Sequence, residues 1–221
     1  MCTSVVLRQG DGKMTDNYYD REEWSQSEMK LILDSGIDVA VAAKRRMLPR
    51  PTSKSIDLGQ LAHMFVLGGD PDAFIVSPYA DFRTKEASNW KTEAEESCKT
   101  IVTKEQYDTI AAIVDNIEAH PRSKELLKDK NVRHEVEMYA KINGIDLRGK
   151  ADSIFQNGNS LIITDIKTTA QFDEWKRKAQ RRHYDLQASV YSIIAAESLG
   201  VSASMVNFYF CVAETVAPYR V

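Results

Sequence analysis

Three carboxylates and one lysine in the second half of the chain have the types and spacing to hold a divalent cation: Glu135, Asp152, Asp165 and Lys167. Each carboxylate falls in a segment with the pattern of a β-strand, and like charges on adjacent strands destabilise a sheet unless something compensates them. Mg²⁺ binds a few carboxylates together with waters and substrate phosphates. Such an ion polarises a phosphoryl oxygen and lowers the pKa of an attacking water, while a nearby lysine orients that water or stabilises the developing charge. The alternative is a surface sheet with ordinary solvated acids, because Asp-x-Lys alone is common.

Two tight turns determine how these residues face one another. Residues 132–142 alternate apolar and polar side chains, as in a half-buried strand, and Asn143-Gly144 is a strong hairpin signal. With the first hairpin centred there, the numbers of opposed residues add to 287, so Glu135 faces Asp152. A second turn centred on Gly158-Asn159 makes opposed numbers add to 317, and Asp152 then faces Asp165. Alternation along the third strand places Lys167 on the same face as Asp165.

The rest of the chain predicts helices around this three-stranded meander, which covers residues 132–142, 146–155 and 161–167. Capping boxes at Ser25 and Thr103 each open a helix, and Pro121 ends the second of these. The stretch through Pro71 and Pro78 has the composition of a loop. Further helices are predicted at 38–47, 55–67, 171–182 and 184–198, and a buried strand at 205–212.

This order of elements predicts one domain of mixed α/β (α+β) class, with helices packed against a central mixed sheet. We expect a loose arm over residues 1–24, a mainly helical part over 25–130 and a sheet core over 131–221. No apolar run is long enough to span a bilayer, and the first residues lack the pattern of a signal peptide. Cys2, Cys98 and Cys211 lie far apart, which argues against a disulfide framework, a zinc knuckle or an iron–sulfur cluster and fits a reducing cytoplasm.

Basic residues gather in two clusters, although the net charge of the chain is −3. Contact with phosphate requires only one positive face, so the distribution of charge matters more than the sum. The second cluster is a candidate nucleic-acid surface, and a solvated helix face is the equally open alternative. The first cluster is Lys44, Arg45, Arg46, Arg50 and Lys54, and the second is Lys176, Arg177, Lys178, Arg181 and Arg182.

Several motifs together resemble the RecB-type branch of the PD-(D/E)xK nucleases. They are Gly149-Lys150-Ala151-Asp152, Asp165-Ile166-Lys167-Thr168-Thr169 and Gln187-Ala188-Ser189-Val190-Tyr191, preceded by a helix that carries His63. Within that branch, the segments at 18–22, 25–27 and 217–219 are similar to RecE-type (exonuclease VIII) phage recombination exonucleases. The resemblance runs from about residue 18 to the end of the chain and implies a restriction-endonuclease-like core.

The resemblance also implies roles for individual residues. Asp152, Asp165, the backbone carbonyl of Ile166 and the imidazole of His63 would bind Mg²⁺, with Mn²⁺ as a substitute. Lys167 would position or activate the attacking water, and Glu135 would support the site. Gln187 and Tyr191, four residues apart on one helix face, would brace the site or touch substrate. Without the resemblance, His63 is an ordinary helix histidine, and Gln187 and Tyr191 could simply cap and pack their helix.

The function implied is a Mg²⁺-dependent exonuclease that degrades linear double-stranded DNA from its ends, in the 5′-to-3′ direction. The exposed single strands would pass to an annealing protein in homologous recombination, and a ring-forming homo-oligomer would enclose the product strand. One alternative is an endonuclease of the same fold. Another is a catalytically silent DNA-binding or protein-interaction module, which the presence of Asp152, Asp165 and Lys167 disfavours.

Overall fold

The structure of the protein is a computed structural model, which describes residues 18, 21–48, 58–97, 99–158 and 160–221. The chain forms two compact units that are interleaved along the sequence. The first unit contains residues 1–52, 130–165 and 173–210, and the second contains residues 53–129, 166–172 and 211–221. None of the helices in the described ranges is long and apolar enough to cross a bilayer.

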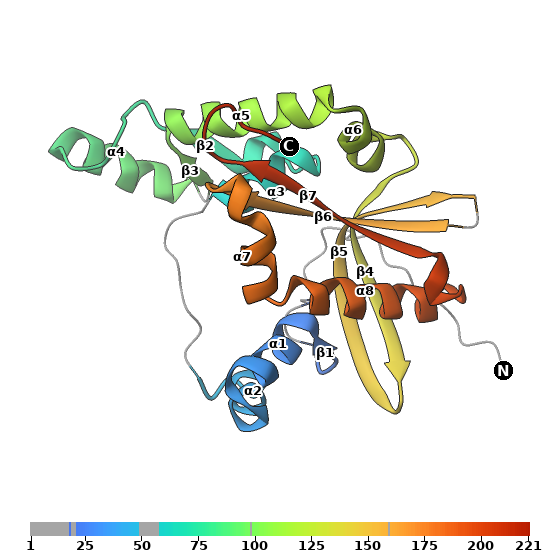
Figure 1. The fold of residues 1–221 in the computed structure, drawn as a ribbon. Coiled ribbons are helices and arrows are strands. Elements are labelled where there is room, and N and C mark those ends of the chain that lie inside the picture. Colours follow the sequence, from blue (N-terminus) through green and yellow to red (C-terminus); the bar gives the residue numbers. More distant parts are fainter. Residues whose placement is uncertain (1–17, 19–20, 49–57, 98, 159) are drawn as a thin grey trace. The chain divides into compact units, whose positions relative to one another are not determined.

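The first unit is built on a mixed sheet, as predicted. Its strand order is β1-β5-β6-β7, with β4 paired to the long strand β5. β5 pairs antiparallel with both β4 and β6, whereas β1 pairs with β5 in parallel (Figure 1). β6 and β7 continue into the second unit. The strands are β1 (Trp24–Ser25), β4 (Arg133–Ile142), β5 (Ile145–Asn157), β6 (Ser160–Thr169) and β7 (Val206–Glu214).

The register of both hairpins confirms the predicted alignment. Met138 pairs with Gly149 along β4 and β5, so opposed residue numbers add to 287, and the same sum holds from one end of the ladder to the other. Between β5 and β6, Ser153 pairs with Thr164, so opposed numbers add to 317. Asn143 and Gly144 both have positive φ, of 51° and 82°, as a two-residue hairpin turn requires.

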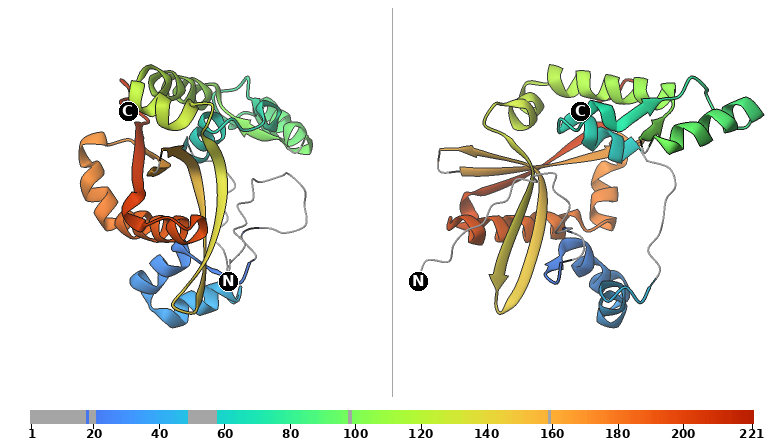
Figure 2. Two further views of the ribbon diagram at one scale, coloured as in Figure 1. Left: turned by 90° about the vertical axis from the view of Figure 1, so that its right-hand side faces the viewer. Right: turned by 180° about the vertical axis from the view of Figure 1, so that it is seen from behind.

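Among the described residues, the first unit has four α-helices. The helices are α1 (Gln26–Ser35), α2 (Ile37–Lys44), α7 (Trp175–Arg181) and α8 (Tyr184–Leu199). The predicted capping box of α1 is present, with Ser25 and Glu28 as its two members. α8 lies across β4 and β5 (Figures 1 and 2) and buries Val190 and Ile194 against them. This packing carries the polar residues of α8 to the strands that hold the carboxylates.

The second unit is mainly helical and contains elements that the sequence did not predict. The stretch through Pro71 and Pro78, expected as a loop, contains the short strand β2 (Phe74–Val76). The residues between it and α5 (Lys104–Ala119), for which no element is predicted, contain α4 (Lys85–Glu96) and β3 (Thr100–Val102), which pairs in parallel with β2. Pro121 ends α5 as expected, but it also begins α6 (Pro121–Lys128), because proline fits the first turn of a helix. α3 (Leu58–Val66) packs against α5, and residues 55–57 of its predicted range lie outside the described residues.

The N-terminal segment was expected to be a loose arm, and where it is described this is wrong. Trp24 pairs with Leu147 and Ser25 with Arg148, which makes β1 part of the sheet. The missed strand is only two residues long, so it has no periodicity that a sequence pattern could reveal.

Candidate active site

Glu135 and Asp152 bring two carboxylates together in the first unit. A side-chain oxygen of each lies within 4.8 Å of the other. The β4–β5 register assigns them to opposed positions, and Glu135 adopts a left-handed backbone conformation there, with a φ of 53°. Such a conformation is costly for a residue other than glycine and concentrates at functional positions. Lys150, two residues before Asp152, forms an ion pair with Glu135 and offsets part of the repulsion.

Asp165 is the third carboxylate of the predicted row, and it is 2% exposed. The paired residues of the β5–β6 ladder end at Ser153 and Thr164, one position short of Asp152 and Asp165. Gln187, on α8, donates a hydrogen bond from Nε2 to Oδ1 of Asp165 over 2.5 Å. Because the glutamine is neutral, it orients Asp165 while leaving the negative charge available to a cation.

Tyr191 lies one helical turn after Gln187 and faces the same carboxylates. Burial raises the pKa of its hydroxyl far above the usual value, and Tyr18, Asp165 and Asp152 raise it further. The hydroxyl therefore stays protonated at neutral pH and can serve as a hydrogen-bond donor but not as a general base.

Gly149 makes room for the ring of Tyr191 on strand β5. A methyl group at Gly149 would stand 3.3 Å from two carbons of the Tyr191 ring and 3.4 Å from Cε of Met138. The glycine before Lys150 therefore has a packing role that the sequence pattern alone did not reveal. The need for a glycine at position 149 follows only from the contact between β5 and α8.

His63 and Ile166, both assigned to the metal by the resemblance, lie together in the second unit. Nε2 of His63 is 3.1 Å from the backbone oxygen of Ile166. Two neighbouring ligands of an octahedral ion with bonds of about 2.1 Å also stand about 3 Å apart. The spacing of this pair therefore fits a shared cation as well as a direct hydrogen bond.

Lys167 completes the motif on β6. Ile166 follows Asp165 directly, and the boundary between the two units falls between them. Alternation along one continuous strand gives Asp165 and Lys167 the same face, while the side chain of Ile166 is fully buried. Lys167 is partly exposed, so its ammonium group can reach solvent or a substrate.

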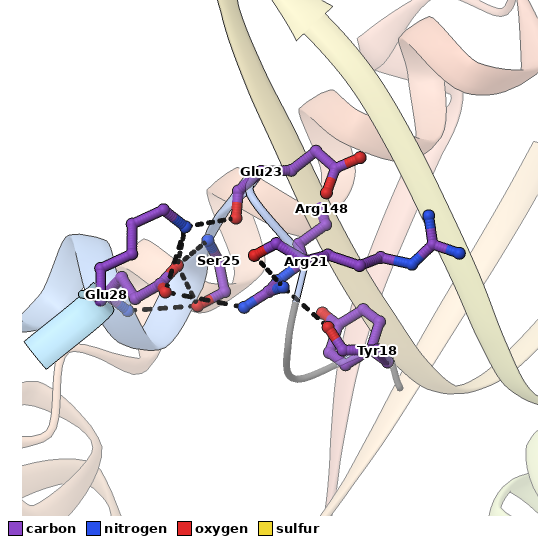
Figure 3. A network of polar contacts seen from close by, with 7 residues as sticks. Tyr18, Arg21, Glu23, Ser25, Glu28 and Arg148 are labelled. Atoms are coloured by element: carbon purple, nitrogen blue, oxygen red, sulfur yellow. Dashed lines mark hydrogen bonds and ion pairs between the residues drawn. The ribbon is translucent and has the colours of Figure 1, made fainter. Parts of the chain in front are cut away.

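Arg148, on β5, is the centre of a buried polar network (Figure 3). Its Nη1 donates to the backbone oxygens of Tyr18 and Arg21 at 2.7 and 2.9 Å, and its Nη2 lies 3.6 Å from Glu28. Glu28 also accepts a hydrogen bond from Lys44 at 3.3 Å. The network ties the segment before α1 to β5, four residues before Asp152.

The two basic clusters differ in the structure. Lys44 donates to the backbone oxygen of Glu23 and stacks over the ring of Trp24, so it belongs to the fold. Arg50 and Lys54 lie outside the described residues. The second cluster is on and just after α7, where all of its residues except the half-buried Lys178 are exposed: Lys176, Arg177, Lys178, Arg181 and Arg182.

Two residues of the α7 cluster have identifiable neighbours. Arg177 forms an ion pair with Glu174 at 2.5 Å. Burial and the nearby Arg182 lower the pKa of Lys178, which is the direction expected where positive charges crowd together. The crowding of like charges is relieved when an anion binds, so the cluster remains a candidate phosphate surface.

Comparison with known proteins identifies a family and a solved structure of similar fold. The family described as "PDDEXK-like domain of unknown function (DUF3799)" matches residues 25–221. No curated protein matches the chain. A crystal structure described as "Putative exonuclease" from Eubacterium rectale has a TM-score of 0.61 and 16% sequence identity, and the match covers 95% of this chain and 76% of that chain. At this identity the likeness shows the fold, a mixed sheet with flanking helices.

Proposed function

Since this chain belongs to the family of PDDEXK-like domains of unknown function (DUF3799), we propose that it is a metal-dependent deoxyribonuclease that degrades linear duplex DNA from its ends. The observation that carries the proposal is the buried pair of aspartates on adjacent strands, with Asp165 held by Gln187. Nucleases of this superfamily use divalent metals, and the donor groups of this chain suit one. Asp152 supplies a carboxylate within 4.8 Å of that of Glu135.

We assign the metal ligands to Asp152, Asp165, the carbonyl of Ile166 and the imidazole of His63. Three of these four donors are oxygen atoms, the type that Mg²⁺ prefers, and Mn²⁺ also accepts the imidazole nitrogen. When bound, the ion would supply Lewis-acid polarisation of the phosphate and a water of lowered pKa. The spacing of His63 Nε2 and the Ile166 oxygen supports their part of this assignment.

The side chains around the carboxylates have separate tasks in this proposal. Lys167 orients the attacking water and stabilises charge that builds on the phosphate. Gln187 fixes Asp165, and the protonated hydroxyl of Tyr191 lies near Asp165 and Asp152, where it can contact substrate. Glu135 supports the site and is itself balanced by Lys150. The basic residues of α7 bind the phosphate backbone of the duplex.

Cleavage from ends, in the 5′-to-3′ direction, rests on the RecE-type motifs of the sequence, as does the delivery of single strands to an annealing protein. An endonuclease of the same fold is the alternative. Incubation with linear and covalently closed circular duplex, with and without Mg²⁺ or Mn²⁺, separates the two. We expect mononucleotides and a long single strand from linear DNA only, and end-labelled substrates report the direction. Rapid nicking of closed circles at low enzyme concentration would replace the exonuclease by the endonuclease.

The metal assignment is tested by substitution. Asp165→Ala and Asp152→Ala should abolish cleavage without loss of thermal stability in the absence of metal, because each removes a ligand and a repulsive charge. Asp146→Ala, at the exposed tip of the β4–β5 hairpin, is the matched control and should cleave normally. Lys167→Ala should slow single-turnover hydrolysis by about 10²-fold with metal and DNA affinity nearly unchanged. Near-normal cleavage by either aspartate variant would show that the site lies elsewhere.

A further inference from the structure

Strand β5 has a stretch with no neighbouring strand on one of its two edges. β4 follows β5 along one edge, so β1 and β6 must both pair along the other. On that second edge β1 pairs with Leu147 and Arg148, and the residues that pair with β6 begin at Ser153. Residues 149–152, all of them described, therefore pair with neither β1 nor β6, and they are called the open edge of β5 below.

Several groups of the candidate active site lie along the open edge of β5. Asp152 is its last residue, and Asp165 follows directly after the last residue of β6 that pairs with β5. The ring of Tyr191 packs against Gly149, which is the first residue of the open edge. A substrate bound at the two carboxylates therefore has the open edge of β5 beside it.

Tyr18 is fixed at the opposite end of the open edge, next to Arg148. Its backbone oxygen accepts a hydrogen bond from Nη1 of Arg148 at 2.7 Å. The guanidinium of Arg148 also lies over the Tyr18 ring, with Cζ 4.9 Å from the centroid of the ring, as in a cation–π pair (Figure 3). Arg148 is buried and Tyr18 is partly exposed, so part of the tyrosine remains accessible to a ligand.

The hydroxyl of Tyr18 lies close to that of Tyr191. After burial, Tyr18 contributes most to the raised pKa of Tyr191, ahead of Asp165 and Asp152, because a negative charge on one hydroxyl disfavours a second charge nearby. A tyrosine hydroxyl is an uncharged hydrogen-bond donor. Such a donor can bind a phosphate oxygen without neutralising the carboxylates that are to hold a cation.

We propose, resting on the nuclease function proposed above, that Tyr18 binds the DNA substrate, with its hydroxyl donating a hydrogen bond to the phosphate next to the one that is cleaved. Arg148 and Asp152 are four residues apart, which is about 13 Å along an extended strand. The side chain of Tyr18 covers only part of that length, so its hydroxyl reaches a neighbouring phosphate rather than the one at the carboxylates. The alternative is that Tyr18 only covers Arg148, which the aromatic ring could do without its hydroxyl.

Removal of the hydroxyl alone separates the two roles of Tyr18. Tyr18→Phe keeps the ring over Arg148, so its urea unfolding should match that of the parent protein. Its affinity for a duplex end, measured in the Lys167→Ala background where hydrolysis should be slow, should fall about tenfold or more, because a hydrogen bond to a charged acceptor is lost. Tyr209→Phe is the matched control: Tyr209 is 39% exposed on β7, and this variant should bind normally. Unchanged affinity in Tyr18→Phe, or the same loss in both variants, would overturn the inference.

A modified substrate tests whether the hydroxyl contacts one particular phosphate. A methylphosphonate carries a methyl group in place of one phosphate oxygen, and the methyl group cannot accept a hydrogen bond. At the phosphate next to the cleaved one, this change should weaken binding about tenfold more in the Lys167→Ala protein than in the same protein with Tyr18→Phe. At more distant phosphates the two proteins should lose affinity equally. Equal losses at every phosphate, with normal cleavage of unmodified DNA by the unaltered protein, would overturn this inference alone. A chain that neither binds nor cleaves duplex DNA would overturn the proposed function as well.

Discussion

Arg148 allows a quantitative test of how the N-terminal segment is held to the sheet. Arg148 is 3% exposed, and its side chain donates to the backbone oxygens of Tyr18 and Arg21 and lies close to Glu28. Hydrogen bonds from a charged donor contribute about 1.5–3 kcal/mol each, and removing one member of a buried polar cluster costs about 3–5 kcal/mol. We therefore expect Arg148→Met, which keeps the length of the side chain, to lower the free energy of unfolding by about 3–5 kcal/mol.

The assay is urea unfolding followed by circular dichroism and by tryptophan fluorescence, because agreement of the two transitions justifies a single free energy. Lys141→Met is the control: Lys141 pairs with Asp146, but both side chains are more than half exposed, so the cost should stay below about 1 kcal/mol. Adding Glu28→Gln to Arg148→Met should cost less than the two single changes together, since each single variant leaves the other group poorly paired. A loss below about 1 kcal/mol in Arg148→Met would refute the idea that this network anchors the segment.

Three further predictions concern the site and its surroundings. Gly149→Ala should cost about 1–3 kcal/mol in urea unfolding and slow cleavage, because the new methyl group displaces the Tyr191 ring; a fully active, equally stable variant would show that the ring has room. The pKa of Glu214 is lowered by its bonds to Arg220, so their stabilisation is present above the usual glutamate pKa of about 4.3 and is lost as pH falls through the lower folded value. Glu214→Gln should therefore have a lower Tm than the unaltered protein at pH 7, and the difference between the two Tm values should become smaller below pH 4. A difference in Tm that stays constant across pH contradicts this. Neutralising Lys176, Arg177 and Lys178 should weaken DNA binding and reduce the slope of log affinity against log salt by about 0.9 for each DNA phosphate that the protein no longer neutralises, and unchanged binding would mark a solvated face.

The meander could be predicted from sequence because its signals are local. Alternating side chains define each strand, and residues that tolerate positive φ define the turn at Asn143-Gly144. Once both turns are centred, the register follows by counting, and with it the opposed positions of Glu135 and Asp152. The opposition of Glu135 and Asp152 was therefore accessible from the sequence alone.

The missed helices lacked the signal on which the prediction depended. α4 buries only Ala87 and Ala94, so it has no wide apolar stripe, and the sequence around it contains prolines and serines. Thr84 does cap its first turn by accepting a hydrogen bond from the Ala87 backbone, but a cap without periodicity predicts little. For α6, the sequence predicts Pro121 only as the end of the preceding helix, although proline equally suits the first turn of the next.

Contacts between distant parts of the chain could not be predicted from local patterns. Arg148 is joined to Tyr18 across 130 positions of sequence, and no local pattern distinguishes a buried arginine from an exposed one in a half-buried strand. The packing of Tyr191 against Gly149 could not be predicted either, because it depends on where α8 crosses β5. The bond from Gln187 to Asp165 became a hypothesis only through the resemblance to nucleases.

The carboxylates Glu135, Asp152 and Asp165 lower the stability of the first unit, and other features of the same unit offset this loss. Like-charged carboxylates on adjacent strands repel each other, and two residues near the row adopt left-handed backbone: Glu135 itself, and His183, one turn before Gln187. Next to them the sheet has a dry core of fully buried residues such as Met138 and Ile163, which supplies the stability that the row lacks. Lys150 and Gln187 lower the cost but do not remove the charge of the aspartates. The charge that remains on these carboxylates inside a stable sheet is what we propose binds the cation of a metal-dependent nuclease.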